Sequence, residues 1–214
     1  MKKTLLLLAL CFGFTSVSHA GFGVGLQGGI APAKGKFVTI TGERSNDKMH
    51  PLAGIEVFWE AEAEIDALGV KIGYNQMLSS VKEEASVFYG GYYWYRDTEK
   101  IKTNVFAIPI TAYYKYKATP SLHIIGGLGV SLVHFDYEAE FKSESSYGNY
   151  YDSVSKDHWK VVPHLNLGVE WRMFESFGLG ADIKYLFGGK QEFFSIDSVD
   201  VSGLQMGITA RYYF

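Results

Sequence analysis

The most regular feature of the chain is an alternation of apolar and polar residues with a period of two. In residues 204–214, Leu204, Met206 and Ile208 fall on one parity, whereas Gln205 and Thr209 fall on the other. Successive side chains of a strand point to opposite faces, so this segment predicts a strand with one apolar face. Its length matches the ~9–11 residues that a tilted strand needs to cross the hydrocarbon core of a bilayer.

The same alternation recurs along the chain and predicts eight strands in all. The expected strands lie near residues 21–30, 53–61, 68–75, 104–117, 122–132, 161–173, 179–185 and 204–214. Their connections alternate in length. The expected short turns are 62–66, 117–120 and 174–177, and the expected long loops are 31–50, 79–103, 136–160 and 188–201. The sequence therefore predicts an all-β fold, an eight-stranded antiparallel up-and-down transmembrane β-barrel with short periplasmic turns and long extracellular loops.

Two of the long connections contain signals for additional strands. Aromatic residues flank Gly90-Gly91, which suits a two-residue hairpin turn, and residues 147–150 give a similar hint. These signals predict a sheet that protrudes above the membrane. Within the fourth strand, Pro109 cannot donate a ladder hydrogen bond, so we expect a bulge or other irregularity there.

The first 20 residues predict a secretory signal peptide. A basic start at Lys2 and Lys3 is followed by an apolar run and by a small-residue end, with cleavage expected after Ala20. Residues 21–214 then form one barrel domain without cysteine, because the only cysteine is Cys11. Removing Lys2 and Lys3 from the 20 basic residues leaves 18 against 23 acidic ones, and this charge of −5 argues against nucleic-acid binding.

The end of the sequence resembles the C-terminal signature of bacterial outer-membrane β-barrels, a terminal aromatic residue with apolar residues at every second position before it. The residues that carry this resemblance are Ile208, Ala210, Tyr212 and Phe214. The chain is similar to the small barrels of the OmpA-transmembrane, OmpX-like and opacity-like porin group. The resemblance implies that the outer-membrane assembly machinery reads these four residues as a signal, and that the protein resides in the outer membrane of a Gram-negative bacterium.

Period-two alternation alone does not distinguish a membrane barrel from a soluble lipocalin-like barrel with an apolar interior. Three features favour lipid on the outside: glycines populate the polar face, which suits a narrow lumen, aromatic residues cluster at both strand ends on the apolar face, and the last residue is the aromatic Phe214. The expected periplasmic girdle consists of Trp59, Tyr114, Tyr116, Trp171, Tyr212 and Phe214. The expected extracellular girdle consists of Tyr74, Phe106, Tyr185 and Phe187.

Charged residues on the polar face predict a network of salt bridges inside the barrel, because buried charges persist only when they are paired. The expected network consists of Glu56, Glu60, Lys71, Lys115, Glu170, Arg172, Asp182, Lys184 and Arg211. We expect Glu170 and Arg172 to contact Asp182 and Lys184, and Asp182 to contact Arg211. Such a network serves either as a gate or proton path or as electrostatic filling, and the narrow interior of an eight-stranded barrel favours filling.

Motifs for catalysis and cofactors are weak. The G-x-G-x-x-G match at residues 23–28 opens no helix, so luminal glycines explain it better than nucleotide binding. The histidines lack the paired spacing of zinc sites, and we expect no cofactor and no metal. One compact set, Ser131, His134 and Asp136 with Asp157-His158 nearby, suggests a lipid A-modifying enzyme as an alternative, but no motif of such enzymes is present.

The second long connection is rich in aromatic residues, a composition common at protein-binding surfaces. The candidate interaction surface consists of Phe88, Tyr89, Tyr92, Tyr93, Trp94 and Tyr95, and Tyr147, Tyr150 and Tyr151 add to it from the third connection. These rings equally suit cross-strand pairs that merely stabilise the hairpins. We expect a monomer with a structural or surface-interaction role, in contact with outer-membrane lipid and with an unidentified extracellular partner. A narrow channel for a small solute is the other alternative.

Overall fold

The computed structural model describes residues 19–62, 66–194 and 196–214, so the expected signal peptide and Cys11 lie outside the described residues except for His19 and Ala20. The described strands are β1 (His19–Thr39), β2 (Gly42–Glu62), β3 (Asp66–Met77), β4 (Val81–Tyr89), β5 (Tyr95–Lys117), β6 (Leu122–Ser145), β7 (Gly148–Phe174), β8 (Phe177–Leu186), β9 (Lys190–Phe193), β10 (Asp197–Asp200) and β11 (Gly203–Tyr213). Within these ranges, no helix is long and apolar enough to cross a membrane.

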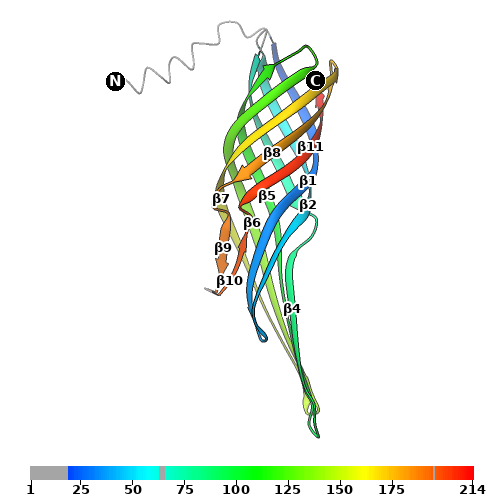
Figure 1. Cartoon of the computed structure of the whole chain (residues 1–214), viewed down its shortest axis with the longest axis vertical. Coiled ribbons are helices and arrows are strands. Elements are labelled where there is room, and N and C mark those ends of the chain that lie inside the picture. The colour runs from blue at the N-terminus through cyan, green and yellow to red at the C-terminus, as the bar shows by residue number, and fades with distance from the viewer. Residues whose placement is uncertain (1–18, 63–65, 195) are drawn as a thin grey trace, which may run out of the picture.

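Eight strands close into a ring in which each strand is antiparallel to both neighbours. The order around the ring is β1, β2, β3, β5, β6, β7, β8 and β11, and β11 returns to β1 with pairs from Gly23↔Tyr213 to Ile30↔Met206 (Figure 1). A closed ring leaves no unpaired edge, which is the condition for a sheet in lipid. The predicted eight-stranded antiparallel barrel is confirmed.

At one end of the barrel, here called the turn end, short connections join the strands. Strand β5 ends at Lys117 and β6 begins at Leu122, and β7 ends at Phe174 and β8 begins at Phe177, in agreement with the predicted turns. The third predicted turn falls between Glu62 and Asp66, and its central residues lie outside the described residues.

At the opposite, extended end, the four predicted long connections are present, strands occupy most of their residues, and the predicted protruding sheet is confirmed. Strands β1 and β2 pair continuously up to Thr39↔Gly42, and β6 and β7 pair up to Ser145↔Gly148. Strand β4 pairs with β5, with residues 90–94 as the connection in place of a two-residue turn. The fourth connection contains the β9–β10 hairpin, which lies beside β1. Together β4 to β7 form a tongue that reaches far beyond the barrel (Figure 1).

The ladder around Pro109 is interrupted without a bulge. Between β3 and β5 the pairs Ile72↔Ile110 and Asn75↔Ala107 belong to one register, but the pairs between them are missing. On its other side Pro109 stays in register with Ser131. The expected irregularity is therefore a gap in one ladder, and the register shift in the barrel occurs instead between Arg172 and Phe174.

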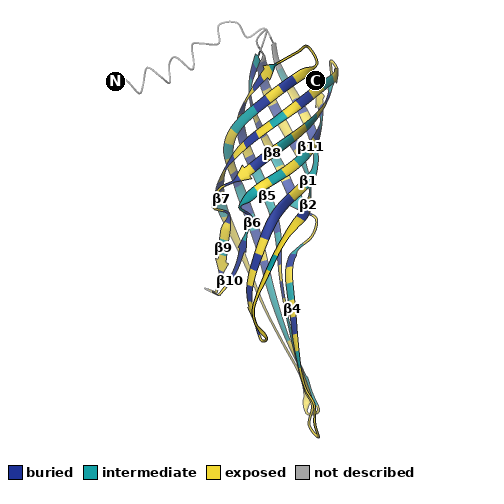
Figure 2. Cartoon of the chain, viewed as in Figure 1, coloured by how far each residue is buried: buried dark blue, intermediate teal, exposed yellow. Residues whose placement is uncertain are grey.

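The apolar face of the barrel points outward. Leu26, Leu128 and Ile208 are 65–70% exposed, whereas Glu56, Lys115 and Glu170 on the other parity are at most 3% exposed. The exposed and buried residues alternate along each barrel strand in Figure 2. The predicted orientation is confirmed, and it suits a barrel surrounded by hydrocarbon rather than water.

Aromatic rings mark both ends of this apolar band. Toward the extended end, the Phe106 ring lies 5.4 Å from the Tyr74 ring and 5.3 Å from the Trp159 ring. Trp159 thus belongs to the extracellular girdle, although it was not among the residues predicted for it. At the turn end, the Tyr212 and Phe214 rings lie 5.2 Å apart.

The polarity of the two faces reverses along the same strands beyond the extracellular girdle. On β6, Leu128 and Val130 face outward, but further along Asp136 faces outward while Phe135 and Tyr137 are buried. On β5, Ile101 is buried between the exposed Lys100 and Lys102. An outward apolar face suits lipid and an inward one suits water, so the reversal marks the upper boundary of the membrane band.

The inward apolar residues form a core that fills the barrel at its extended end. Its members come from nine strands and from the connection between β10 and β11, and they are Ala31, Ala33, Phe37, Met77, Val81, Ile101, Val105, Val133, Phe135, Tyr137, Val162, Leu186, Phe193, Val199 and Val201. The β9–β10 hairpin contributes Phe193, whose ring stacks on Tyr137 at 4.6 Å. The polar lumen is therefore covered by an apolar layer on this side.

Candidate functional site

The polar lumen lies in the half of the barrel nearer the turn end. Along each strand, every second side chain points into the barrel, and glycines at some of these inward positions leave space for long charged residues. At Gly25, for example, an added Cβ would lie 2.8 Å from Cγ of Glu56. The small residues of β1 thus give room to the charges of β2.

Glu170 on β7 is the centre of the largest cluster. Its carboxylate accepts hydrogen bonds from Nη1 of Arg211 at 2.6 Å and from the hydroxyl of Tyr213 at 2.6 Å, and Nζ of Lys115 lies 3.5 Å away. Nδ1 of His123 is 3.6 Å from the same carboxylate. Four inward side chains from three strands therefore surround one fully buried carboxylate.

The cluster extends through two more carboxylates. Nε of Arg211 donates to Glu56 at 2.7 Å, and Nζ of Lys71 lies 3.4 Å from the other oxygen of Glu56. Lys115 donates to Oε2 of Glu60 at 2.7 Å, and the hydroxyl of Tyr113 donates to Oε1 of Glu60 at 2.7 Å. These contacts bring together Glu56, Glu60, Lys71, Lys115, Glu170 and Arg211 in one connected network.

The three remaining residues of the expected network have other surroundings. Asp182 accepts hydrogen bonds from Asn166 and Thr209, each at 3.2 Å, so the expected Asp182–Arg211 pair is wrong. The guanidinium of Arg172 lies 4.0 Å from the centre of the Tyr213 ring. Lys184 is buried and lines two small cavities with Asn75 and Gln205, and no ion pair within 4.0 Å joins it to Glu170 among the described residues.

The sequence analysis did not anticipate the neutral partners of these charges. Tyr213, His123 and Gln27 lie on the inward parity, so alternation could have suggested them, but it gives no information on which charge they reach. His164 is a further case, because its Nε2 lies 2.9 Å from the Thr111 hydroxyl and its Nδ1 lies 3.0 Å from the Ser131 hydroxyl.

The free space between these side chains is small. Two cavities beside Lys184 have volumes of about 20 Å³ each, and a third beside Asp182 has about 10 Å³. A cavity needs roughly 10–15 Å³ to hold one water molecule. The described part of the lumen thus offers space for single waters.

The residues of the suggested catalytic set do not come together. The Ser131 side chain is inside the barrel against His164. His134 is outside, between the Phe106 and Trp159 rings, and the centre of each of these rings lies 4.7 Å from the centre of the imidazole. Asp157 lies 3.9 Å from Nε2 of His134 and is exposed. The Ser131 and His134 side chains of the suggested catalytic set therefore lie on opposite faces of the sheet.

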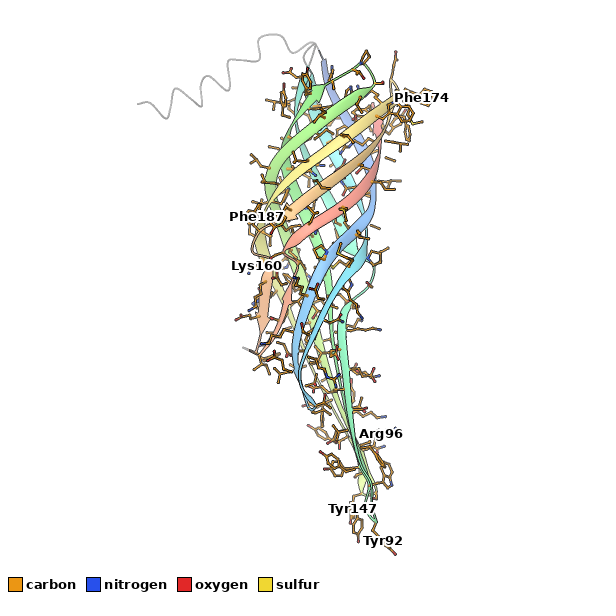
Figure 3. All side chains as sticks on the ribbon, in the orientation of Figure 1. Tyr92, Arg96, Tyr147, Lys160, Phe174 and Phe187 are labelled. Atoms are coloured by element: carbon orange, nitrogen blue, oxygen red, sulfur yellow. The ribbon has the colours of Figure 1, made fainter. Side chains whose placement is uncertain are left out.

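The candidate interaction surface lies at the tip of the tongue. Phe88, Tyr89, Tyr92, Tyr93, Trp94 and Tyr95 are all at least 40% exposed, and Tyr92 is 99% exposed. The Tyr89 and Tyr95 rings stack at 4.5 Å, and the Tyr93 ring stacks on Tyr147 at 5.3 Å. Figure 3 shows Tyr92 and Tyr147 together at the far end of the molecule. The two hairpins thus share one aromatic tip.

The residues of the expected assembly signal lie on the lipid-facing side of β11. Ile208 is 70% exposed and Phe214 is 80% exposed, and the amide of Phe214 donates to the carbonyl of Phe22 on β1. Ala210 and Tyr212 lie between them on the same face, opposite Leu26 and Val24. These residues stand at the seam that closes the barrel.

The comparison with protein families agrees with this architecture. The family model of the outer membrane protein beta-barrel domain matches residues 4–214. No curated protein matches the sequence. Solved structures that are similar include Ail, the attachment invasion locus protein of Yersinia pestis, with 12% identity, 90% of this chain and 98% of that chain covered, and a TM-score of 0.45. Neisserial surface protein A has 12% identity, with 92% of this chain and 100% of that chain covered, and a TM-score of 0.47. OprG from Pseudomonas aeruginosa has 11% identity, coverage of 93% and 97%, and a TM-score of 0.47.

Proposed function

Because the chain belongs to the outer membrane protein beta-barrel domain family, we propose that this outer-membrane protein of Gram-negative bacteria acts by surface display. In this proposal a packed barrel anchors a rigid tongue, and the tongue presents an aromatic tip to an extracellular partner.

The observation that carries the proposal is the aromatic tip at the end of a continuous sheet. From Phe106 in the extracellular girdle to Tyr95 at the tip, β5 runs for about 35 Å at ~3.3 Å per residue. The tip exposes rings with few rotatable bonds, which give large contact area at low entropic cost. Cross-strand stacking accounts for one face of several rings, and the other faces remain available for binding.

The apolar core supports a barrel that is closed to solutes. It spans the interior above the polar network, and ions crossing it would lose their hydration without polar groups to replace it. The network below it is consistent with electrostatic filling of a narrow lumen. A non-enzymatic role is supported by the separation of Ser131 and His134 on opposite faces of β6.

The experiment compares adhesion of cells that display the wild-type protein with cells that display the triple variant Tyr92→Ser, Tyr93→Ser and Trp94→Ser. The matched control, Val38→Ser with Ile40→Ser, removes exposed apolar side chains from the tip of the β1–β2 hairpin. Retention is measured on surfaces coated with an extracellular-matrix extract. We expect the tip variant to lose most of the retention and the control to keep it. Equal retention by all three strains contradicts the proposal, and stepwise conductance in planar bilayers contradicts the closed barrel.

A further inference from the structure

A groove of about 650 Å³ opens on the extracellular side, between the β1–β2 hairpin and the sheet of β4, β5 and β6. It forms because β2 and β3 stop pairing at Leu52↔Met77, after which β2 follows β1 and β4 follows β5. It is separate from the polar lumen and from the aromatic tip, and the surface-display role does not use it.

One wall of the groove contains His50, which is 4% exposed. Its Nδ1 lies 3.2 Å from the carbonyl oxygen of Ser79 and 2.8 Å from the Ser79 hydroxyl. Ser79 thus engages Nδ1, and the tautomer of the ring decides whether Nε2 accepts or donates. Nε2 has no hydrogen-bond partner among the described residues. A sugar hydroxyl, which both donates and accepts, would satisfy this buried nitrogen in either tautomer.

The opposite wall carries a pair of lysines. Lys82 on β4 and Lys102 on β5 are directly opposite each other and are both exposed on the same face. Within the described chain neither forms an ion pair within 4.0 Å, and Lys48 lines the same groove. Like charges in directly opposite positions destabilise a sheet, so an anion between them would relieve the repulsion.

The groove also contains acceptors for hydroxyl groups. Glu138 lies opposite Lys102 on β6, and Glu140 lies opposite Lys100, and their carboxylates line the groove together with those of Glu83 and Glu84 on β4. A purely basic groove would suit a bare polyanion, whereas this one offers cations, carboxylates and an imidazole nitrogen together. That combination fits a ligand with an anionic phosphate and several hydroxyls.

The height of the groove indicates where such a ligand comes from. Lys102 lies about 13 Å beyond Phe106 of the extracellular girdle, measured along β5 toward the tip at ~3.3 Å per residue. Girdle aromatics sit at headgroup level, so the groove opens just above the outer leaflet. We propose that this groove binds the phosphorylated saccharide headgroup of an outer-leaflet glycolipid. Lys82 and Lys102 hold the phosphate, the glutamates accept hydrogen bonds from sugar hydroxyls, and Nε2 of His50 pairs with a further hydroxyl.

The test measures binding of diphosphoryl lipid A to the folded protein in detergent by native mass spectrometry. We expect Lys82→Gln with Lys102→Gln to weaken binding roughly tenfold or more, because charge-assisted contacts to phosphate are lost. His50→Asn keeps a donor toward Ser79 but removes Nε2, and we expect it to weaken binding roughly threefold. The matched control is Lys36→Gln with Lys142→Gln, which removes the same charge from exposed lysines outside the groove. Unheated gel mobility verifies that each variant is folded.

Two further ligands separate the sources of binding. Enzymatically dephosphorylated lipid A is expected to bind no better to the wild type than to the groove variant, and soluble glucosamine 1-phosphate is expected to compete with lipid A. Equal affinities of the groove and control variants overturn the proposal, and so does binding that survives dephosphorylation. Binding of glucosamine 1-phosphate without binding of lipid A overturns the assignment to a membrane glycolipid. None of these results depends on adhesion by the aromatic tip.

Discussion

Nη1 of Arg211 on the closing strand lies 2.6 Å from Oε2 of Glu170, across the interior of the barrel. Through Nε, the same guanidinium also binds Glu56 at 2.7 Å. Arg211 thereby links β11 to β7 and to β2, which are not its neighbours in the sheet. The ring is held together by cross-lumen contacts as well as by its backbone ladder.

Substitution of Glu170 by alanine tests the energetic role of this link. The change leaves Lys115 and Arg211 with fewer buried counter-charges, and breaking a buried ion pair from one side typically costs about 3–5 kcal/mol. We expect a loss of this size in the free energy of unfolding, measured by urea titration in lipid vesicles with tryptophan fluorescence. Glu192→Ala is the control, because Glu192 pairs with Lys190 at the surface. A stability equal to that of the control would show that the network contributes nothing.

The glycines of β6 provide a second prediction. At Gly129 an added Cβ would lie 2.0 Å from the carbonyl oxygen of Ile110, whereas at Gly126 the nearest atom would be a Leu167 methyl at 3.7 Å. We expect Gly129→Ala to lower the yield of folded barrel sharply, because a backbone atom has to move. Gly126→Ala should fold like the wild type. The measurement is the fraction with altered gel mobility after refolding into detergent, and similar fractions for both variants would contradict the packing described here.

The β9–β10 hairpin is tied to the core by Asp197, which accepts hydrogen bonds from the Tyr137 hydroxyl at 2.5 Å and from the amide of Val38 at 2.8 Å. We expect Tyr137→Phe to loosen this hairpin by about 1–3 kcal/mol, because the buried carboxylate loses a donor. Hydrogen exchange of residues 190–200 measures the effect. Protection that is unchanged in the variant would contradict this attachment.

The same contact predicts a dependence on pH. Burial of the phenol, and next its hydrogen bond to Asp197, raise the pKa of Tyr137 above its ordinary value of 10.0. The folded state therefore retains the proton where the unfolded chain has lost it, and the stabilisation is complete below about pH 10 and falls as the pH rises further. Exchange protection of the hairpin in the wild type should decrease above that pH, and Tyr137→Phe should lack this component. A decrease of the same size in both proteins would exclude Tyr137 as its origin.

Alternation predicted the strands, their faces and the short turns because a two-residue period depends only on local sequence. It did not show how far the strands continue into the long connections at the extended end, since the polarity of their faces reverses once they leave the lipid. Residues such as Ile101 and Lys102 still alternate, but in the sense of a water-soluble sheet. The reversal itself was visible in the sequence as a signal for the membrane boundary.

The network illustrates a different limit. Parity placed Glu170, Arg211 and Asp182 inside, but the contacts between them depend on strand tilt and on register around the ring. Glu170 consequently meets Arg211 and Lys115 across the lumen, and Asp182 meets Asn166 and Thr209 nearby. The groove beside His50 was likewise hidden, because it arises where β2 and β3 stop pairing.

The central claim is that every second residue of the barrel strands faces lipid while the others fill a packed interior. Spin labels placed one at a time at residues 122–126, 128 and 130–132 of β6, in lipid vesicles, test it by their collision rates with oxygen, which is concentrated in lipid, and with a water-soluble nickel chelate. We predict oxygen maxima at the even positions, including Leu128, and low rates with both reagents at odd positions such as Ile125. Maxima at the odd positions, or high chelate access there, would contradict the account.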